Sequence, residues 1–480
     1  MTRAAAVLAA MLCVMLCAAP AAQAQERQML HAGWRIQSSA KVGTNGMSIS
    51  SSSYRPVGWH HATVPSTVVG ALVDDGLYGD PFFGMNLHKL PGMTYPVGAN
   101  FVHTAMDKSS PYAVPWWYRT TFALPKAMKG KRIRLNFDGI NYRANIWLNG
   151  KRVADSSQVA GTYRRYELDV TSVVKAAGTN VLAVEIFAPD TADLQTTWVD
   201  WNPSPPDKNM GLWQPAYLAA SGDVVVRYPA VASTVDTATL SSAELTVSAD
   251  VKNLTSRSVT GTLRGRIGRV AFSRPVTLAP GDSALVHFTP DSFPQLRLKD
   301  PRLWWPAELG KPNLSDLTLE FVTSAGVSDW QHMTFGIRQV TSEMTPKGAI
   351  LFRVNGRRIL VRGGGWTPDM FFRPQPVRQD AQLQYALDMH LNTLRLEGNY
   401  EDDRFWARTD SLGLLVMSGW VCCQPFEEWA KWGPEQFVVA AASLGDQIRR
   451  LRGHASALVW LNGSDNPPPA NVEQMYLAIE

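Results

Sequence analysis

Apolar and polar residues alternate along many short stretches in the first part of the chain. The alternation runs through residues 115–122, 131–137, 144–148 and 180–186. A period of two is the mark of a half-buried β-strand. Asn149 and Gly150 join two such stretches and are a strong signal for a two-residue hairpin. We therefore expect residues 25–222 to form an antiparallel jelly-roll sandwich.

A second β-rich block follows, with expected strands at residues 243–251, 283–288 and 317–322 and breakers such as Pro280-Gly281 between them. Roughly a hundred residues with about seven short strands suit an immunoglobulin-like sandwich, which we assign to residues 223–340.

The periodicity of apolar residues changes near Gln339, where stretches with helical spacing begin to alternate with short apolar runs. Such alternation predicts βα units and a parallel sheet. About four units fit residues 341–480, so we expect an incomplete (β/α)8 TIM barrel with unpaired strand edges and poor folding of this segment. The expected strands are residues 358–362 (leading into Gly363-Gly-Gly365), 392–396, 414–417 and 457–461, and the expected helices are residues 377–390, 402–412 and 434–451.

The N-terminus has the pattern of a secretory signal peptide. Arg3 precedes an apolar run over residues 4–19, and Ala22-Gln-Ala24 supplies a cleavage site. The run is too short for a membrane span, and a lipid anchor is disfavoured. We expect residues 1–24 to be removed and the protein to be exported to a periplasm or the medium. Cys422 and Cys423 then remain, either as a strained disulfide between neighbours or as two buried thiols.

Composition excludes some classes of partner. The formal charge is +5, without an arginine-rich arm, so a nucleic-acid role is not expected. The chain has 17 tryptophans, which fit large cores or sugar-stacking platforms. No histidine or cysteine spacing indicates a metal site, no cofactor is expected, and oligomeric state is not indicated.

Several motifs in combination resemble glycoside hydrolase family 2. Trp147-Leu-Asn-Gly150 is similar to the family's W-x-N-G hairpin, Phe335-Gly-Ile-Arg338 to its F-G-x-R link, and Asn392-Thr-Leu-Arg395 to its N-x-x-R strand. The resemblance implies the order of jelly roll, immunoglobulin-like domain and barrel deduced above. Trp460-Leu-Asn-Gly-Ser-Asp465 has aspartate where most relatives carry a catalytic glutamate. A Ser-Asp ending is similar to the exo-β-D-glucosaminidase branch, with β-mannosidase as the alternative.

The resemblance implies a retaining exo-β-glycosidase that releases glucosamine from chitosan oligosaccharides. Asp465 would be the general acid/base, although Asp-Asn-Pro is also good turn chemistry. Glu397 would bind the substrate ammonium group, or alternatively pair with Arg395. Trp366 and Trp420 would wall a sugar ring, or pack in a core. The other expected substrate-binding residues are Asp200, Trp201, Asn462 and Arg395.

The family's nucleophile is a glutamate near the end of barrel strand seven, which these 480 residues do not include. We therefore expect the 480-residue chain to have no significant glycosidase activity alone. A non-catalytic carbohydrate-binding protein remains a second class of function.

Overall fold

The first part of the chain is a sandwich of two antiparallel sheets. A computed structural model describes residues 27–480 except 94–104, 197, 199–203, 399 and 421–424, so residues 1–24 and the Cys422–Cys423 pair lie outside the described residues. In spatial order, one sheet contains β1 (Arg27–Met29), β12 (Ala216–Ser221), β6 (Arg132–Phe137) and β9 (Tyr166–Asp169). The other contains β3 (His60–Ala62), β2 (Trp34–Ser38), β5 (Trp116–Ala123), β10 (Thr179–Phe187), β7 (Arg143–Leu148) and β8 (Lys151–Ala154). Short elements flank them: α1 (Gly46–Ile49), α2 (Val68–Asp74) and the pair β4 (Ser66–Thr67) and β11 (Gly211–Leu212).

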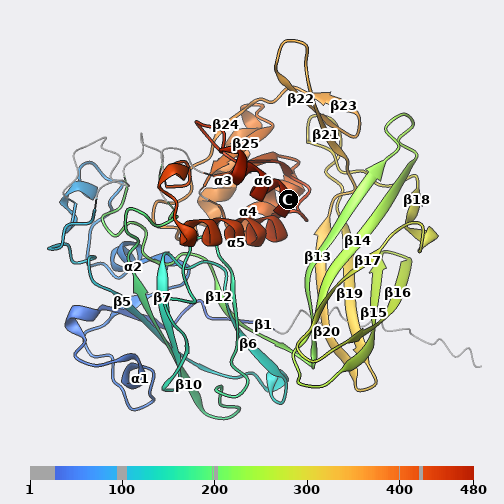
Figure 1. The fold of residues 1–480 in the computed structure, drawn as a ribbon. Helices are drawn as coiled ribbons and strands as arrows, with labels where there is room; N and C mark the ends of the chain where they lie inside the picture. The colour runs from blue at the N-terminus through green and yellow to red at the C-terminus, as the bar shows by residue number, and fades with distance from the viewer. Residues whose placement is uncertain (1–26, 94–104, 197, 199–203, 399, 421–424) are drawn as a thin grey trace, which may run out of the picture.

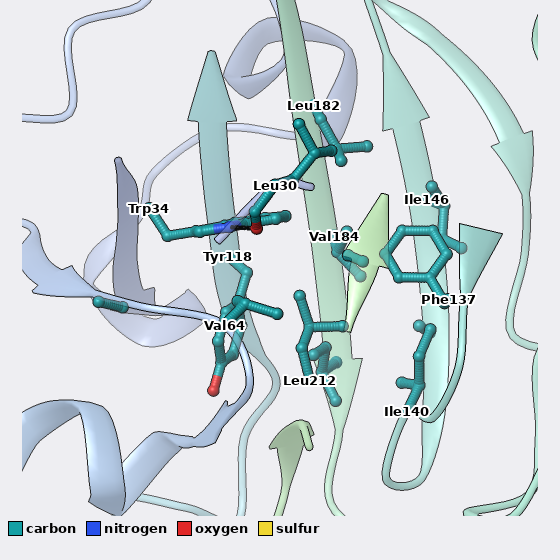
Figure 2. Close-up of a cluster of buried hydrophobic side chains, with 14 of the residues drawn as sticks. Leu30, Trp34, Val64, Tyr118, Phe137, Ile140, Ile146, Leu182, Val184 and Leu212 are labelled. Atoms are coloured by element: carbon teal, nitrogen blue, oxygen red, sulfur yellow. Dashed lines mark hydrogen bonds between the residues drawn. The ribbon is translucent and has the colours of Figure 1, made fainter. Parts of the chain in front are cut away.

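The core of this sandwich lies between the inward faces of its sheets (Figure 2). Phe137 of β6 belongs to the same buried cluster as Tyr118, Val184 and Ile146 of the opposite sheet. The predicted hairpin is present: Asn149 and Gly150 have φ of 52° and 84°. The Asn149 side chain also donates to the carbonyl of Val173 (3.0 Å). The asparagine of the motif therefore has a second role besides adopting the turn conformation.

The second part is another two-sheet sandwich (Figure 1). Its first sheet contains β13 (Val224–Val235), β14 (Ser242–Asn253) and β17 (Ser283–Phe288), with β18 (Arg297–Lys299) paired to β14. Its second sheet contains β16 (Val270–Leu278), β15 (Val259–Ile267), β19 (Ser315–Thr323) and β20 (Gly326–Phe335). Alternate residues of β14 are buried, as the period-two pattern predicts.

The third part contains a parallel sheet. An antiparallel ribbon, β21 (Val340–Met344), β22 (Ile350–Val354) and β23 (Arg357–Ile359), precedes it. The parallel strands are β24 (Gly363–Gly365), β25 (Thr393–Glu397), β26 (Leu415–Gly419) and β27 (Ala457–Leu461), in that spatial order. The helices are α3 (Pro376–Asp388), α4 (Asp403–Leu412), α5 (Pro434–Leu451) and α6 (Ala470–Ile479).

The expectation of a barrel strand over residues 358–362 is wrong. Arg357–Ile359 pairs antiparallel with β22, and Leu360 is 73% exposed. The first parallel strand is instead the glycine triplet, and the edge strands of the sheet are β24 and β27. A Cβ on Gly363 would lie 2.1 Å from the carbonyl oxygen of Thr393, so the close pairing at this position requires glycine.

Two interfaces hold the parallel sheet against the sandwiches. Tyr163 of the first sandwich donates to the carbonyl of Gly398 (2.5 Å) and lies in an aromatic cluster with residues of the third part. Arg338 donates to the carbonyl of Ala457 (2.5 Å), and Trp304 donates to that of Asp410 (2.8 Å). The F-G-x-R motif therefore joins the second sandwich to the last parallel strand.

Gly336 of this motif has no room for a side chain. An added Cβ would lie 2.6 Å from the Cβ atoms of both Ala455 and Trp304. We expect Gly336→Ala to lower the free energy of unfolding by about 1–3 kcal/mol, because the overpacked interface must separate. Urea denaturation would measure this, with Gly43→Ala as the control, since nothing lies within 4 Å of the Cβ there. Equal stability of the two variants would contradict the close-approach explanation.

Candidate active site

Several of the predicted site residues lie where the parallel strands end. β25 ends at Glu397, and Asn462, Ser464 and Asp465 follow the end of β27. Parallel strands bring their carboxyl ends to one edge of a sheet, which is where α/β enzymes place their catalytic groups. Residues separated by more than sixty positions therefore meet at this edge.

Arg395, Glu397 and Ser464 form one hydrogen-bonded network. The Ser464 hydroxyl donates to Glu397 Oε1 (2.5 Å) and accepts from Arg395 Nη2 (2.6 Å). Arg395 Nη2 also lies 3.3 Å from Glu397 Oε1. The network fixes the Glu397 carboxylate against the loop that carries Asp465.

Glu427 holds that loop from the other side. Its Oε1 accepts from the backbone N–H groups of Ser464 (2.6 Å), Asp465 (2.9 Å) and Asn466 (3.4 Å). Three backbone donors that converge on one carboxylate oxygen form an anion-binding turn of the kind that successive backbone amides provide. The carboxylate of Glu427 thereby sets the path of the chain through Asp465.

Asp465 is exposed, and it directly follows the serine of the network. Asn462 is half-buried, and its Oδ1 has no hydrogen-bond partner among the described residues. The exposure of Asp465 is compatible with contact to a ligand at the carboxyl ends of the strands.

Trp366 follows β24 at the same edge and is half-buried. Its indole Nε1 donates to Glu401 Oε1 (2.8 Å), and its ring packs against Phe405 with centroids 5.1 Å apart. Burial raises the pKa of the Glu401 carboxyl to about 7. Gln379 donates to the other Glu401 oxygen at 3.3 Å. This bond fixes the Glu401 carboxyl group, which in turn orients the Trp366 ring through its indole N–H.

Trp420 has a different environment from the one expected for a sugar wall. It is 1% exposed and stacks on Phe426, with centroids 4.5 Å apart and an interplanar angle of 11°. Tyr163 of the first sandwich covers it further, with ring centroids 5.6 Å apart. The structure therefore favours the core-packing alternative, because the indole has almost no surface left for a sugar.

Asp200 and Trp201 lie outside the described residues. Their neighbours nevertheless reach the third part of the chain: Trp198 stacks on Phe372 with centroids 5.4 Å apart. Asn209 also donates to the carbonyl of Met370 (2.7 Å). Both contacts are with the segment that follows β24.

Sequence reasoning missed the roles of Ser464 and Glu427. Ser464 was part of a motif without an assigned contact, and Glu427 was not singled out. Glu427 follows β26 and so belongs to the same edge as the other site residues. That position was the available signal, because loops after parallel strands supply site residues.

The described residues contain no group of three or more side chains able to hold a metal ion. Within the same residues, no helix is long and apolar enough to cross a membrane.

Comparison with known proteins places this architecture in a class. Residues 34–197 match the glycosyl hydrolase 2 galactose-binding domain-like family, and residues 224–338 match the glycosyl hydrolases family 2 domain. Together these two matches span more than half of the chain. The chain therefore belongs to glycoside hydrolase family 2.

Relatives within the family are more specific. The chain is 39% identical to an exo-β-D-glucosaminidase of Streptomyces avermitilis, over 93% of this chain and 48% of the relative. It is 35% identical to one of Amycolatopsis orientalis, over 93% of this chain and 41% of the relative. The crystal structure of the A. orientalis exo-chitosanase CsxA superposes with a TM-score of 0.85 at 33% identity, covering 94% of this chain and 51% of that one. The chain thus spans about half the length of the curated relatives it matches.

Proposed function

We propose that this chain provides the acid/base side of an exo-β-D-glucosaminidase active site that acts on chitosan oligosaccharides. The observation that carries the proposal is the Arg395–Ser464–Glu397 network beside Asp465 at the carboxyl edge of the parallel sheet. The exo-β-D-glucosaminidases and the exo-chitosanase among the relatives support the choice of substrate. Residues 25–222, 223–340 and 341–480 are the proposed jelly roll, immunoglobulin-like domain and first half of a (β/α)8 barrel.

In the proposed mechanism, Asp465 protonates the oxygen of the departing sugar. A retaining glycosidase needs a second carboxylate about 5 Å away to attack the anomeric carbon. The resemblance places that nucleophile on a later barrel strand, so catalysis needs residues beyond the four parallel strands described. Glu427 positions the Asp465 backbone through its bonds to the loop.

Glu397 is the proposed site for the ammonium group at C2 of glucosamine. Among the described residues, its hydrogen bonds from Ser464 and Arg395 both reach Oε1, which leaves Oε2 for a ligand. An ammonium group adds the attraction of an ion pair to its hydrogen bond with a carboxylate, whereas a hydroxyl group offers the hydrogen bond alone. This difference is the proposed basis for preferring glucosamine over mannose.

The test is a binding titration of the 480-residue chain with D-glucosamine and with D-mannose. We expect tighter binding of glucosamine, weakened roughly 10–100-fold in Glu397→Gln, because one charge-assisted bond contributes about 1.5–3 kcal/mol. Glu473→Gln, an exposed position on α6, is the control. Preference for mannose would favour a β-mannosidase, and unchanged glucosamine affinity in Glu397→Gln would refute the ammonium site.

The same preparation tests the need for a nucleophile. We expect no release of glucosamine from chitosan oligosaccharides by the 480-residue chain, and clear turnover would contradict that part of the proposal. We also propose that residues 1–24 direct export and are removed, which the N-terminal sequence of the secreted chain would test.

A further inference from the structure

A cleft of about 450 Å³ lies where the three parts of the chain meet. β6 of the first sandwich, β13 and β20 of the second, and the end of α5 all contribute residues to it. None of Arg395, Glu397, Ser464 and Asp465 lines it, so it is separate from the candidate active site.

The lining of this cleft is rich in arginine. Asp138, Glu167 and Asp403 are its carboxylates, so positive charge exceeds negative charge by three when its histidines are neutral. The arginines are Arg27, Arg134, Arg165, Arg227, Arg449 and Arg450. The cleft thus concentrates a large part of the excess charge of a chain whose total is only +5.

The carboxylates do not neutralise every arginine. Asp138 pairs with Arg165 at 2.8 Å, and Asp403 pairs with Arg450 at 3.0 Å. Glu167 is shared between Arg134 (3.6 Å) and Arg227 (3.7 Å), both beyond hydrogen-bonding distance. Arg134 also donates to Ser221 Oγ (3.4 Å), and Arg449 lies 3.8 Å from Asp446, but no carboxylate of the described residues hydrogen-bonds these guanidinium groups.

Arg134 is the most deeply buried of these arginines. Its side chain is only 3% exposed, and its Nε has no hydrogen-bond partner among the described residues. The Nε of Arg227 is also buried and has no hydrogen-bond partner among the described residues. Burying a guanidinium N–H without an acceptor is unfavourable, and oxyanions match the fork geometry of arginine best.

We propose that this cleft binds a multivalent oxyanion through Arg134, Arg227 and Arg449. Arg449 lies in the last turn of α5, where its charge also offsets the partial negative charge of the helix end. Because the arginines come from all three parts of the chain, a bound anion would link them. This site goes beyond the proposed glycosidase function and does not depend on it.

The test is calorimetric titration of the full 480-residue chain with pyrophosphate, with ionic strength held constant by sodium chloride. We expect one site per chain, and a dissociation constant raised roughly tenfold or more in Arg227→Gln and in Arg449→Gln. Arg358→Gln, exposed on the β23 hairpin, is the matched control and should bind as the parent does. Citrate in place of pyrophosphate distinguishes a site for phosphate groups from one for carboxylates.

Two results would overturn the proposal. One is the absence of saturable binding of both anions by the parent chain. The other is an equal loss of affinity in Arg358→Gln, which would indicate diffuse attraction to a basic protein. Melting temperatures in chloride alone would establish that each variant is folded, so that weaker binding reports the cleft.

Discussion

Glu427→Ala is expected to free the loop that carries Asp465. The substitution removes the acceptor of three backbone N–H groups, those of Ser464, Asp465 and Asn466. Hydrogen bonds to a charged group contribute about 1.5–3 kcal/mol each when buried, and partial exposure reduces the total here. We therefore expect amide hydrogen exchange at these three positions to accelerate roughly 10–100-fold.

Hydrogen exchange followed by mass spectrometry on peptides spanning residues 460–468 would measure this change. Glu428→Ala is the matched control, because the neighbouring Glu428 forms its ion pair with Lys431 (2.6 Å). Glu427→Gln should give an intermediate rate, since it keeps an acceptor oxygen and loses the charge. Exchange that is unchanged in Glu427→Ala would show that the loop is held by other contacts.

Much of the fold could be predicted because its signals are local. Alternation along β14 and the positive-φ turn at Asn149–Gly150 follow from side-chain pattern and backbone sterics alone. The first parallel strand could not be found in this way. An apolar run through Leu360 resembles a strand, whereas a glycine triplet does not. Glycine is needed at position 363 because a Cβ there would collide with a carbonyl of the neighbouring strand. That exclusion depends on where β25 lies, which no local pattern contains.

For the candidate site too, the sequence predicted some features and not others. Glu397 and Asp465 could be assigned to one end of the sheet because Glu397 ends one parallel strand and Asp465 follows another. The hydrogen bond from Ser464 to Glu397 depends on side-chain rotamers. The hydrogen bonds from the loop amides to Glu427 depend on the path of the loop. The burial of Trp420 depends on Tyr163, a residue of the first sandwich more than 250 positions away. Sequence pattern therefore placed the strand ends and left the contacts between them open.

Stability of the chain is expected to fall as pH rises from about 4 to 7, because of buried carboxyl groups such as Asp207. Asp207 is 0% exposed, and burial raises its pKa from 3.8 to about 7 despite hydrogen bonds from the backbone N–H groups of Val69 and Asn209. Asp329 is 4% exposed, and burial raises its pKa to about 6. Between the unfolded and folded pKa values, the folded state holds a proton that the unfolded chain has lost. The stabilisation is therefore complete below pH 3.8 and is lost as pH passes the folded pKa.

Asp207→Asn should remove one such titrating group and so reduce the pH dependence of the free energy of unfolding. Each buried group changes the free energy of unfolding by at most about 1.4 kcal/mol per pH unit, or roughly 2–3 kcal/mol between pH 4.5 and 6.5. Urea denaturation across that range would give the slope. The slope is the relevant quantity, because asparagine can accept only one of the two backbone bonds and lowers stability at every pH. Asp291→Asn, at a side chain 91% exposed, should keep the parent slope. A parent slope retained in Asp207→Asn would mean that Asp207 is ionised in the folded state throughout, with the Val69 and Asn209 amides compensating its burial.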